Sequence, residues 1–300
     1  MLKVAFHEDF IHPLPEGHKF PMEKYELLPF QLLHEGTLEE ANFFKPEIAE
    51  RSLLETIHTS EYLSRLFKLE LTPREQRVSG FPHSTGLIER EARIMEGTRK
   101  CAELALTSRA AMNIAGGTHH AYTDRGEGFC LMNDQAIAAR WLLDSGKVSK
   151  ILIIDLDVHQ GNGTAQIFRN DPNVFTFSMH GRNNYPLKKE MSDLDVELED
   201  GTKDAAYLDI LNRNIDLILN EFKPDFLFYQ SGVDILESDK LGRLSLSLGG
   251  CKKRDEMIVT LAKDLQLPIV CSMGGGYSPE VKDIVEAHSN TYRVIQNILF

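Results

Sequence analysis

The sequence predicts an α/β protein in which one mainly parallel β-sheet is wound between two layers of helices. Three observations predict this fold: short apolar runs recur, helix-length segments separate them, and polar residues gather directly after them. The runs 151–154 and 226–229 are apolar at consecutive positions, which is typical of parallel strands buried on both faces. Strand followed by helix, repeated along the chain, indicates a three-layer wound sheet.

The expected elements follow from these patterns. We expect strands over the apolar runs 3–6, 113–115, 151–155, 174–178, 226–230 and 269–272. We expect helices over 22–34, 86–112, 131–146, 204–222, 252–265 and 279–298. In the fourth of these, Leu208, Leu211 and Ile215 follow the i, i+3, i+4 spacing of one buried face. No repeat or linker divides the chain, so residues 1–300 are predicted to form a single domain.

Composition excludes several classes of protein. The 33 basic and 45 acidic residues leave a net charge of −12, which disfavours binding to a nucleic-acid backbone. The four cysteines form no C-x-x-C pair, so neither a zinc knuckle nor a redox motif is indicated. No apolar run approaches the ~18 residues of a membrane span, and the first residues do not resemble a secretory signal. We therefore expect a cytoplasmic protein with reduced thiols.

Four polar segments follow separate predicted strands. They are 116–120, 155–163, 230–234 and 273–277. Sites in open α/β sheets form at the carboxyl ends of the strands. The four segments are therefore predicted to meet in one crevice.

The segment after residue 154 contains a candidate metal site. Asp157 and His159 are two residues apart, a spacing that places both side chains on one face of an extended chain. Asp234, after another strand, is the leading candidate for a third ligand. Catalytic zinc takes three protein ligands and keeps a position open, and this oxygen-rich set also suits Fe²⁺ or Mn²⁺. The alternative for an isolated Asp-x-His triplet is local capping of a helix near Gly163.

Acid–base groups accompany the candidate ligands. His119 and His120 stand in a glycine-rich turn, and imidazole is suited to moving protons near neutral pH. Asp155 is placed to hold one imidazole and Asn162 the other. Tyr277 follows three glycines, where a phenol can donate to a developing oxyanion; the alternative is a buried core tyrosine.

Five ordered blocks together resemble the zinc-dependent histone deacetylase superfamily, which shares its fold with the arginases. The blocks are Gly116–His120, Gly128–Cys130, Asp155–Gly163, Ser231–Asp234 and Gly274–Tyr277. Within that superfamily, 124–130, 159–163 and Tyr185-Pro are most similar to the class IV branch, in a bacterial-type chain. Class I members usually have histidine where Gln160 stands and aspartate where Asn162 stands.

The resemblance implies a role for each residue of these blocks. Zinc is implied at Asp157, His159 and Asp234, with His120 as general base, His119 paired with Asp155 as its electrostatic partner, and Tyr277 on the substrate carbonyl. The implied wall of the substrate tunnel consists of Gly128, Phe129, Tyr185 and Gly275. A structural potassium ion is implied at Asp155, Asp157, His159, Ser178 and Met179, and an outer cation near Phe168, Asp171 and Val174.

The implied reaction is hydrolysis of Nε-acyl-lysine, with an acetyl or longer acyl group, in a peptide or protein. One alternative is an acetylpolyamine or other small-amine amidohydrolase, for which the acidic run Asp193, Asp195, Glu197, Glu199 and Asp200 offers cation binding; that run is otherwise a solvated edge segment. Another is arginase-like hydrolysis at two manganese ions, with Asp155 recruited as a ligand. A third is a non-catalytic acyl-lysine binding module.

Overall fold

Eight parallel strands form one sheet in the computed structural model, which describes residues 1–300. The strands are β1 (Lys3–Ala5), β2 (Phe43–Phe44), β3 (Ala110–Asn113), β4 (Ile151–Asp155), β5 (Val174–Gly181), β6 (Leu194–Leu198), β7 (Phe226–Gln230) and β8 (Ile269–Ser272). Their order in the sheet is β2-β1-β3-β8-β7-β4-β5-β6, and every neighbouring pair is parallel. The predicted α/β class and wound parallel sheet are therefore confirmed.

Ten α-helices surround the sheet. They are α1 (Lys24–His34), α2 (Arg51–Leu54), α3 (Ser60–Phe67), α4 (Pro73–Ser79), α5 (Thr85–Ser108), α6 (Asp134–Asp144), α7 (Asn162–Phe168), α8 (Asp204–Glu221), α9 (Leu248–Asp264) and α10 (Val281–Leu299), with 3₁₀ turns at Glu8–Phe10 and Glu40–Asn42. No helix is both long enough and apolar enough to span a bilayer.

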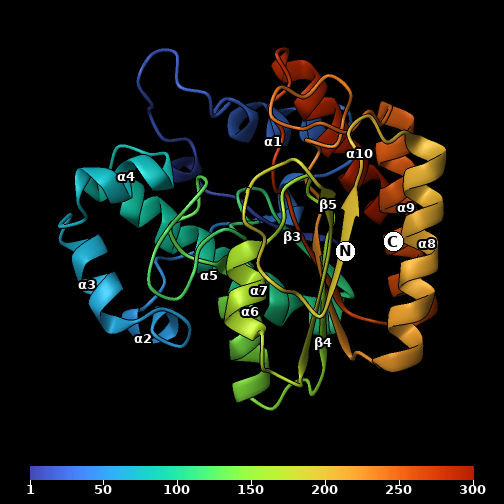
Figure 1. Ribbon diagram of the computed structural model, residues 1–300, viewed down its shortest axis with the longest axis horizontal. Coiled ribbons are helices and arrows are strands. Elements are labelled where there is room, and N and C mark those ends of the chain that lie inside the picture. The colour runs from blue at the N-terminus through green and yellow to red at the C-terminus, as the bar shows by residue number, and fades with distance from the viewer.

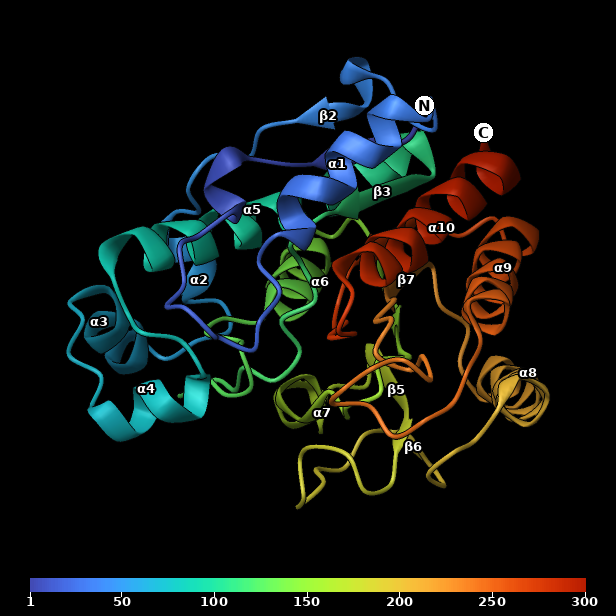
Figure 2. The same ribbon diagram turned by 90° about the horizontal axis from the view of Figure 1, so that it is seen from above.

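The two faces of the sheet carry separate hydrophobic cores because side chains alternate along each strand. Ile151 and Ile153 belong to the core that α5, α6 and α7 cover. Leu152 and Ile154 belong to the core that α8, α9 and α10 cover. Figure 2 shows these two groups of helices on opposite sides of the strands. The consecutive apolar residues of β4 thus fill both cores.

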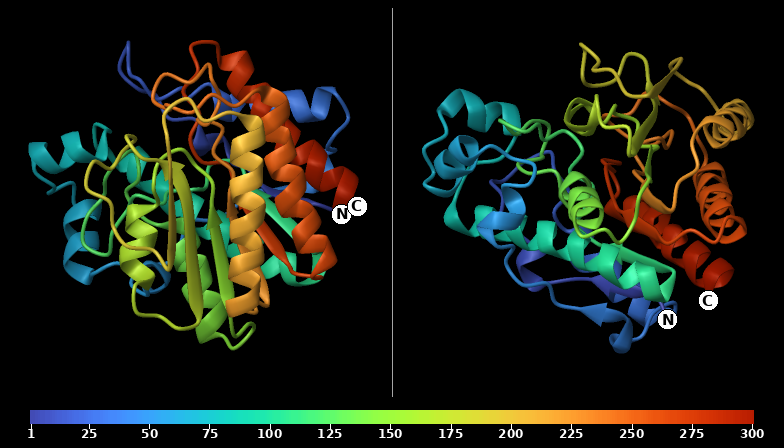
Figure 3. Two further views of the ribbon diagram at one scale, coloured as in Figure 1. Left: turned by 45° about the vertical axis from the view of Figure 1, so that its right-hand side comes forward. Right: turned by 90° about the horizontal axis from the view of Figure 1, so that it is seen from below.

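The remaining helices lie at the margins. In Figure 1, α2, α3 and α4 form a group to one side of the sheet, and α1 packs against α10. The two termini lie close together in both views of Figure 3.

Strand β3 differs from the prediction. The structure places it at Ala110–Asn113, three residues earlier at its start than the expected 113–115. Helix α5 ends at Ser108 because Arg109 has a φ of 73°, a left-handed conformation that stops a helix. The Asn113 side chain then accepts from the Ala115 N–H and donates to the Ile94 carbonyl, which turns the chain out of the sheet.

Several short elements were not predicted. Strand β2 has only two residues, and α2, α3, α4 and α7 have eight or fewer, too few for a clear periodic signal. Strand β6 occupies the acidic run that the sequence analysis treated as a solvated edge, and it lies at the edge of the sheet. Its alternating residues are half-buried rather than buried on both faces.

Candidate active site

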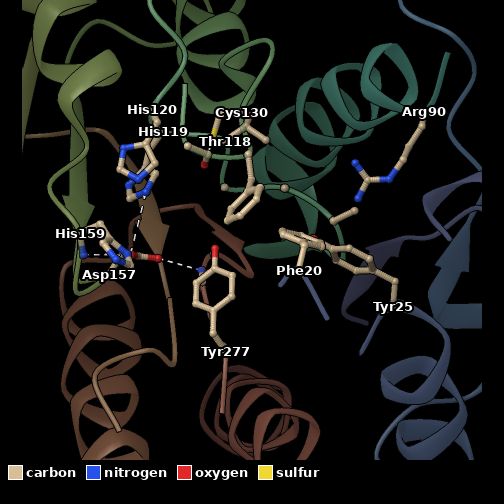
Figure 4. Close-up of a pocket in the computed structure, with 17 residues that line it drawn as sticks. Phe20, Tyr25, Arg90, Thr118, His119, His120, Cys130, Asp157, His159 and Tyr277 are labelled. Carbon is tan, nitrogen blue, oxygen red and sulfur yellow. Dashed lines mark hydrogen bonds and ion pairs between the residues drawn. The ribbon is translucent and has the colours of Figure 1, made fainter. Parts of the chain in front are cut away.

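The four polar segments follow four strands that are neighbours in the middle of the sheet, β3, β8, β7 and β4. Parallel strands place their carboxyl ends on one edge. The four segments consequently converge there, as predicted, and together they line a single cavity (Figure 4).

The chain after β4 brings Asp157 and His159 together through turns, not through the extended backbone that the sequence analysis assumed. The Asp157 N–H donates to Oδ1 of Asp155 at 3.1 Å, and the His159 N–H donates to Oδ1 of Asp157 at 3.0 Å. Aspartate side chains that bond to the backbone two residues on fold the chain in this way. The same carboxylates are thereby oriented into the site.

Asp157, His159 and Asp234 form a buried cluster whose ligand atoms all lie within 4.8 Å of one another. Nδ1 of His159 lies 3.1 Å from Oδ1 of Asp157 and 3.0 Å from Oδ2 of Asp234. The structure therefore brings together the three residues that were expected to bind a metal.

The donor set of this cluster fits a divalent cation. Two buried carboxylates face each other, and neither forms an ion pair with lysine or arginine. Burial and the nearby charge of Asp157 raise the pKa of Asp234 to about 7. A divalent cation relieves this repulsion and uses the imidazole–carboxylate donors that Zn²⁺ and Fe²⁺ accept.

The two adjacent histidines have opposite environments. Nδ1 of His119 lies 2.7 Å from Oδ2 of Asp155, and Nδ1 of His120 lies 2.6 Å from Oδ1 of Asn162. Burial lowers the pKa of His119, but Asp155 and Asp157 outweigh it and raise that pKa to about 9. Burial and the two neighbouring histidines hold the pKa of His120 well below its usual value.

The partner of His120 also fixes its tautomer. An amide oxygen can only accept, so the His120 ring carries its proton on Nδ1 and keeps a lone pair on Nε2. The Asn162 amide is oriented because its Nδ2 donates to the Tyr122 hydroxyl at 3.0 Å. His120 is thus arranged as a neutral base and His119 as an imidazolium.

Tyr277 reaches the site from the loop after β8. The Gly275 N–H donates to Oδ2 of Asp157 at 2.8 Å, and the Tyr277 N–H donates to Oδ2 of Asp239 at 2.6 Å. A Cβ on Gly275 would lie 2.0 Å from Oδ2 of Asp234, so only glycine permits this approach. Burial, with Asp234 and Asp157, raises the pKa of Tyr277 well above its usual value, so the phenol keeps its proton.

Aromatic rings form the walls of the cavity. Phe129 lies 6.0 Å from Tyr277 between ring centroids, and Tyr185 stands edge-on to His120 at 4.9 Å. Gly128 and Phe129 line the cavity, whereas Tyr185 is 37% exposed and lies outside its lining. Phe129 has a φ of 66°, a strained conformation for a non-glycine residue that is characteristic of functional sites.

The cavity itself is small. Its volume is about 40 Å³, and a water molecule needs roughly 10–15 Å³ by this measure. Figure 4 shows His119, His120, His159 and the Tyr277 hydroxyl at one end, and Arg90 at the other.

The residues implied for monovalent cations lie in two places. Asp155 and Ser178 are paired in register between β4 and β5, next to Met179. At the outer position, the Phe168 and Asp171 carbonyls accept backbone N–H groups, and the Asp171 carboxylate pairs with Arg140. Both sites stay predictions.

Several residues around the site carried no recognised sequence signal. Glu127 accepts from the Tyr185 hydroxyl at 2.6 Å. Asp134, at the start of α6, accepts from the Gly117 and Thr118 N–H groups at the turn before His119. Arg254 of α9 donates to the carbonyls of Leu156, Ser231 and Gly232 in the loops that carry Asp157 and Asp234. An Asn-Asp pair before a helical pattern signals a helix start, but it does not reveal which loop the aspartate holds.

Comparisons with known proteins give the same picture. A family model described as the histone deacetylase domain matches residues 18–292. An uncharacterized protein of Picosynechococcus is 41% identical over 295 residues, 98% of each chain. Histone deacetylase 2 of Arabidopsis thaliana is 31% identical over 271 residues, covering 87% of this chain and 70% of its own. The crystal structure of an HDAC homologue from Aquifex aeolicus has a TM-score of 0.87 at 22% identity over 99% of this chain and 84% of its own, a likeness of fold.

Proposed function

We propose that this chain, which belongs to the histone deacetylase family of hydrolases, uses a bound metal to remove a short acyl group from the ε-amine of lysine. The observation that supports this most strongly is the arrangement of a neutral histidine, a charged histidine, a phenol and a three-donor metal cluster around one cavity. The class IV subtype stays a prediction.

The proposed chemistry divides among the side chains. Asp157, His159 and Asp234 would hold a divalent ion, which supplies Lewis acidity toward the carbonyl oxygen and the attacking water. Nε2 of His120 takes the proton of that water. The Tyr277 hydroxyl donates to the oxygen on which negative charge develops. The imidazolium of His119 supports that charge, and a protonated histidine returns a proton to the departing lysine amine.

We propose Zn²⁺ as the resident ion, with Fe²⁺ as the alternative, and K⁺ as a structural ion beside Asp155 and Ser178. Zn²⁺ suits a low-coordinate site with one imidazole and two carboxylates. The short spacing of β4 and β5 at Asp155 and Ser178 supports a monovalent ion there.

The size of the cavity supports a short acyl group. Its volume of about 40 Å³ holds on the order of three waters. An acetyl group has the same number of non-hydrogen atoms. Longer acyl chains would have to displace the Phe20, Phe129 or Tyr277 rings, which pack against one another.

The surroundings of the cavity favour a peptide over a polyamine. The acids of the run over 193–200 have partners of their own, since Asp195 accepts from Gln160, Asp193 from Thr176, and Glu197 and Glu199 pair with Arg182. A larger hollow of about 910 Å³ shares Phe20 and Tyr277 with the cavity, which leaves room for a polypeptide beside the acyl-lysine.

The other two readings have less support. A two-manganese centre needs further carboxylates, and Asp155 is engaged by His119. A non-catalytic binding module has no need of two histidines in opposite charge states.

The test is turnover of acyl-lysine peptides by purified protein, with metal analysis of the same sample. We expect acetyl-lysine peptides to be cleaved faster than myristoyl-lysine peptides and faster than acetylspermidine. His120→Ala serves as the inactive control. Turnover of acetylspermidine alone would overturn the choice of substrate, and absence of any amide hydrolysis with metal bound would overturn the proposal.

A further inference from the structure

Lys24, the first residue of α1, is fully buried beside the candidate active site. Its ammonium lies 5.1 Å from the ring centroid of Phe20, 5.5 Å from that of Tyr25 and 5.6 Å from that of Tyr277. Figure 4 shows these three rings between the metal cluster and Arg90. A lysine at the start of an ordinary surface helix would instead extend into water.

Burial of this ammonium costs free energy that its partners do not repay. Its one hydrogen bond is to the Gly274 carbonyl at 3.3 Å, and no carboxylate lies within ion-pair distance. Burial lowers the pKa of Lys24, Asp234 and Asp157 oppose that effect, and the result is about 8. Lys24 therefore still carries its charge at neutral pH. A buried cation without an anionic partner is usually destabilising relative to an apolar side chain of the same size.

The contacts of Lys24 lead directly to the loop that carries Tyr277. The Gly274 carbonyl accepts from Lys24, and the Gly274 N–H donates to the Gly116 carbonyl at 3.3 Å. The next residue, Gly275, donates to Asp157. The ammonium thus lies at the root of the loop, over the face of the phenol whose hydroxyl faces the cavity.

We propose that Lys24 is a positioning residue for Tyr277, and that its ammonium charge, placed over the phenol ring, stabilises the transition state of amide hydrolysis. The inference rests on the proposed function. The chain surrounds this phenol with the buried carboxylates of Asp157, Asp234 and Asp239, all of which oppose negative charge on the substrate oxygen. Lys24 is the buried lysine that offsets them, and fixed charges act strongly where water is excluded.

Lys24→Met separates this role from a structural one. Methionine has nearly the volume of lysine without its charge, so we expect a melting temperature equal to or above that of the wild type. Over the same comparison we expect kcat to fall about tenfold, the size of effect a buried cation–π contact can supply, with KM changed less than twofold. Lys45→Met, at an exposed lysine paired with Glu8, is the control and should change neither quantity.

A double-mutant cycle with Tyr277→Phe shows whether Lys24 acts through the phenol. We expect Lys24→Met to cost about tenfold in the wild type and less than twofold in the Tyr277→Phe background, because coupled residues are not additive. Calorimetry on the metal-loaded protein should show the same pattern without turnover, with a trifluoromethyl-ketone substrate analogue binding about tenfold more weakly to Lys24→Met.

Each outcome decides the inference. A Lys24→Met variant that is less stable than the wild type would make Lys24 a structural residue and overturn it. Equal turnover of the two proteins, or additive losses in the cycle, would overturn it while leaving the proposed function intact. Absence of turnover in the wild type would overturn both.

Discussion

His119 and His120 show how identical side chains in sequence receive opposite charges. A carboxylate faces Nδ1 of His119 at 2.7 Å, and an amide oxygen faces Nδ1 of His120 at 2.6 Å. Both rings are buried to a similar degree. The partner atom, not the exposure, therefore determines which imidazole is charged and which can accept a proton.

Tyr277→Phe removes one hydrogen-bond donor and leaves the metal cluster untouched. Loss of a single oxyanion donor typically lowers kcat by about 10²–10³-fold, and we expect a loss of that size here. The metal content should equal that of the wild type because the loop is tied to Asp157 through the Gly275 backbone. Steady-state kinetics and metal analysis on one preparation check this, and wild-type turnover by the variant would remove Tyr277 from the mechanism.

His58 makes the stability of the protein depend on pH. Its Nδ1–H donates to the Tyr122 carbonyl and its Nε2 accepts from the Asn133 N–H, so both nitrogens are used by the neutral ring. Burial lowers the pKa of His58 to about 4. The unfolded chain, with a pKa near ~6.5, binds more protons in between, so stability is full above pH 6.5 and falls as the pH drops toward 4.

The expected loss is about 2 kcal/mol at pH 5 relative to pH 7 from this one group. Urea unfolding at the two pH values measures it. His58→Gln cannot titrate and should show a smaller difference between pH 7 and pH 5 than the wild type. Identical differences in the two proteins would show that other groups cause the acid sensitivity.

At the scale of elements, α9 supports the site through Arg254. The fully buried guanidinium donates to three backbone carbonyls in the loops after β4 and β7, and it pairs with Asp255, which in turn accepts from Tyr229. A lysine cannot span three carbonyls in this way. The loops that carry Asp157 and Asp234 therefore depend on the docking of α9.

Arg254→Lys keeps the charge but removes this fork. We expect metal affinity to fall about 10–100-fold, the usual effect of altering groups that orient the ligands. A competition titration with a chromophoric chelator measures it, and Arg213→Lys on the exposed face of α8 is the control. A wild-type dissociation constant in Arg254→Lys would show that the loops hold their shape without it.

The sequence predicted the elements whose patterns are local and strong. Strands β4, β7 and β8 fall on their expected residues because each is a continuous buried run. The start of β3 was missed because Ala110 and Ala111 fit a helix as well as a strand, and only the conformation of Arg109 separates the two. Strand β6 was missed because an edge strand with polar residues resembles a loop.

The candidate site divides in the same way. Asp157, His159 and Asp234 could be grouped because their segments follow strands, and parallel strand ends meet on one edge. Lys24, Glu127 and Arg254 could not, because they reach the site from helices and loops whose packing is set by distant parts of the chain. Their residue types are those of ordinary surface positions, and burial is what distinguishes them.

At the scale of the whole molecule, the two cores hold the sheet rigid while acids collect at its carboxyl edge. Asp155, Asp157 and Asp234 are all nearly or fully buried. Burial of like charges destabilises a fold unless a cation accompanies them. The stability of the entire chain should consequently depend on what occupies the cluster of Asp157, His159 and Asp234.

Removal of metal by a chelator should therefore lower the melting temperature, since a ligand that binds only the folded state adds about 4 kcal/mol at a thousandfold excess over its dissociation constant. For a chain of this size that corresponds to a shift of roughly 10 °C. Asp234→Asn separates the two causes. It removes a ligand and one repelling charge, so its melting temperature without metal should equal or exceed that of the chelated wild type and should not respond to added Zn²⁺. A wild-type protein whose melting temperature ignores both chelator and Zn²⁺ would show that the buried acids are neutralised by protons instead, and that no divalent ion binds them.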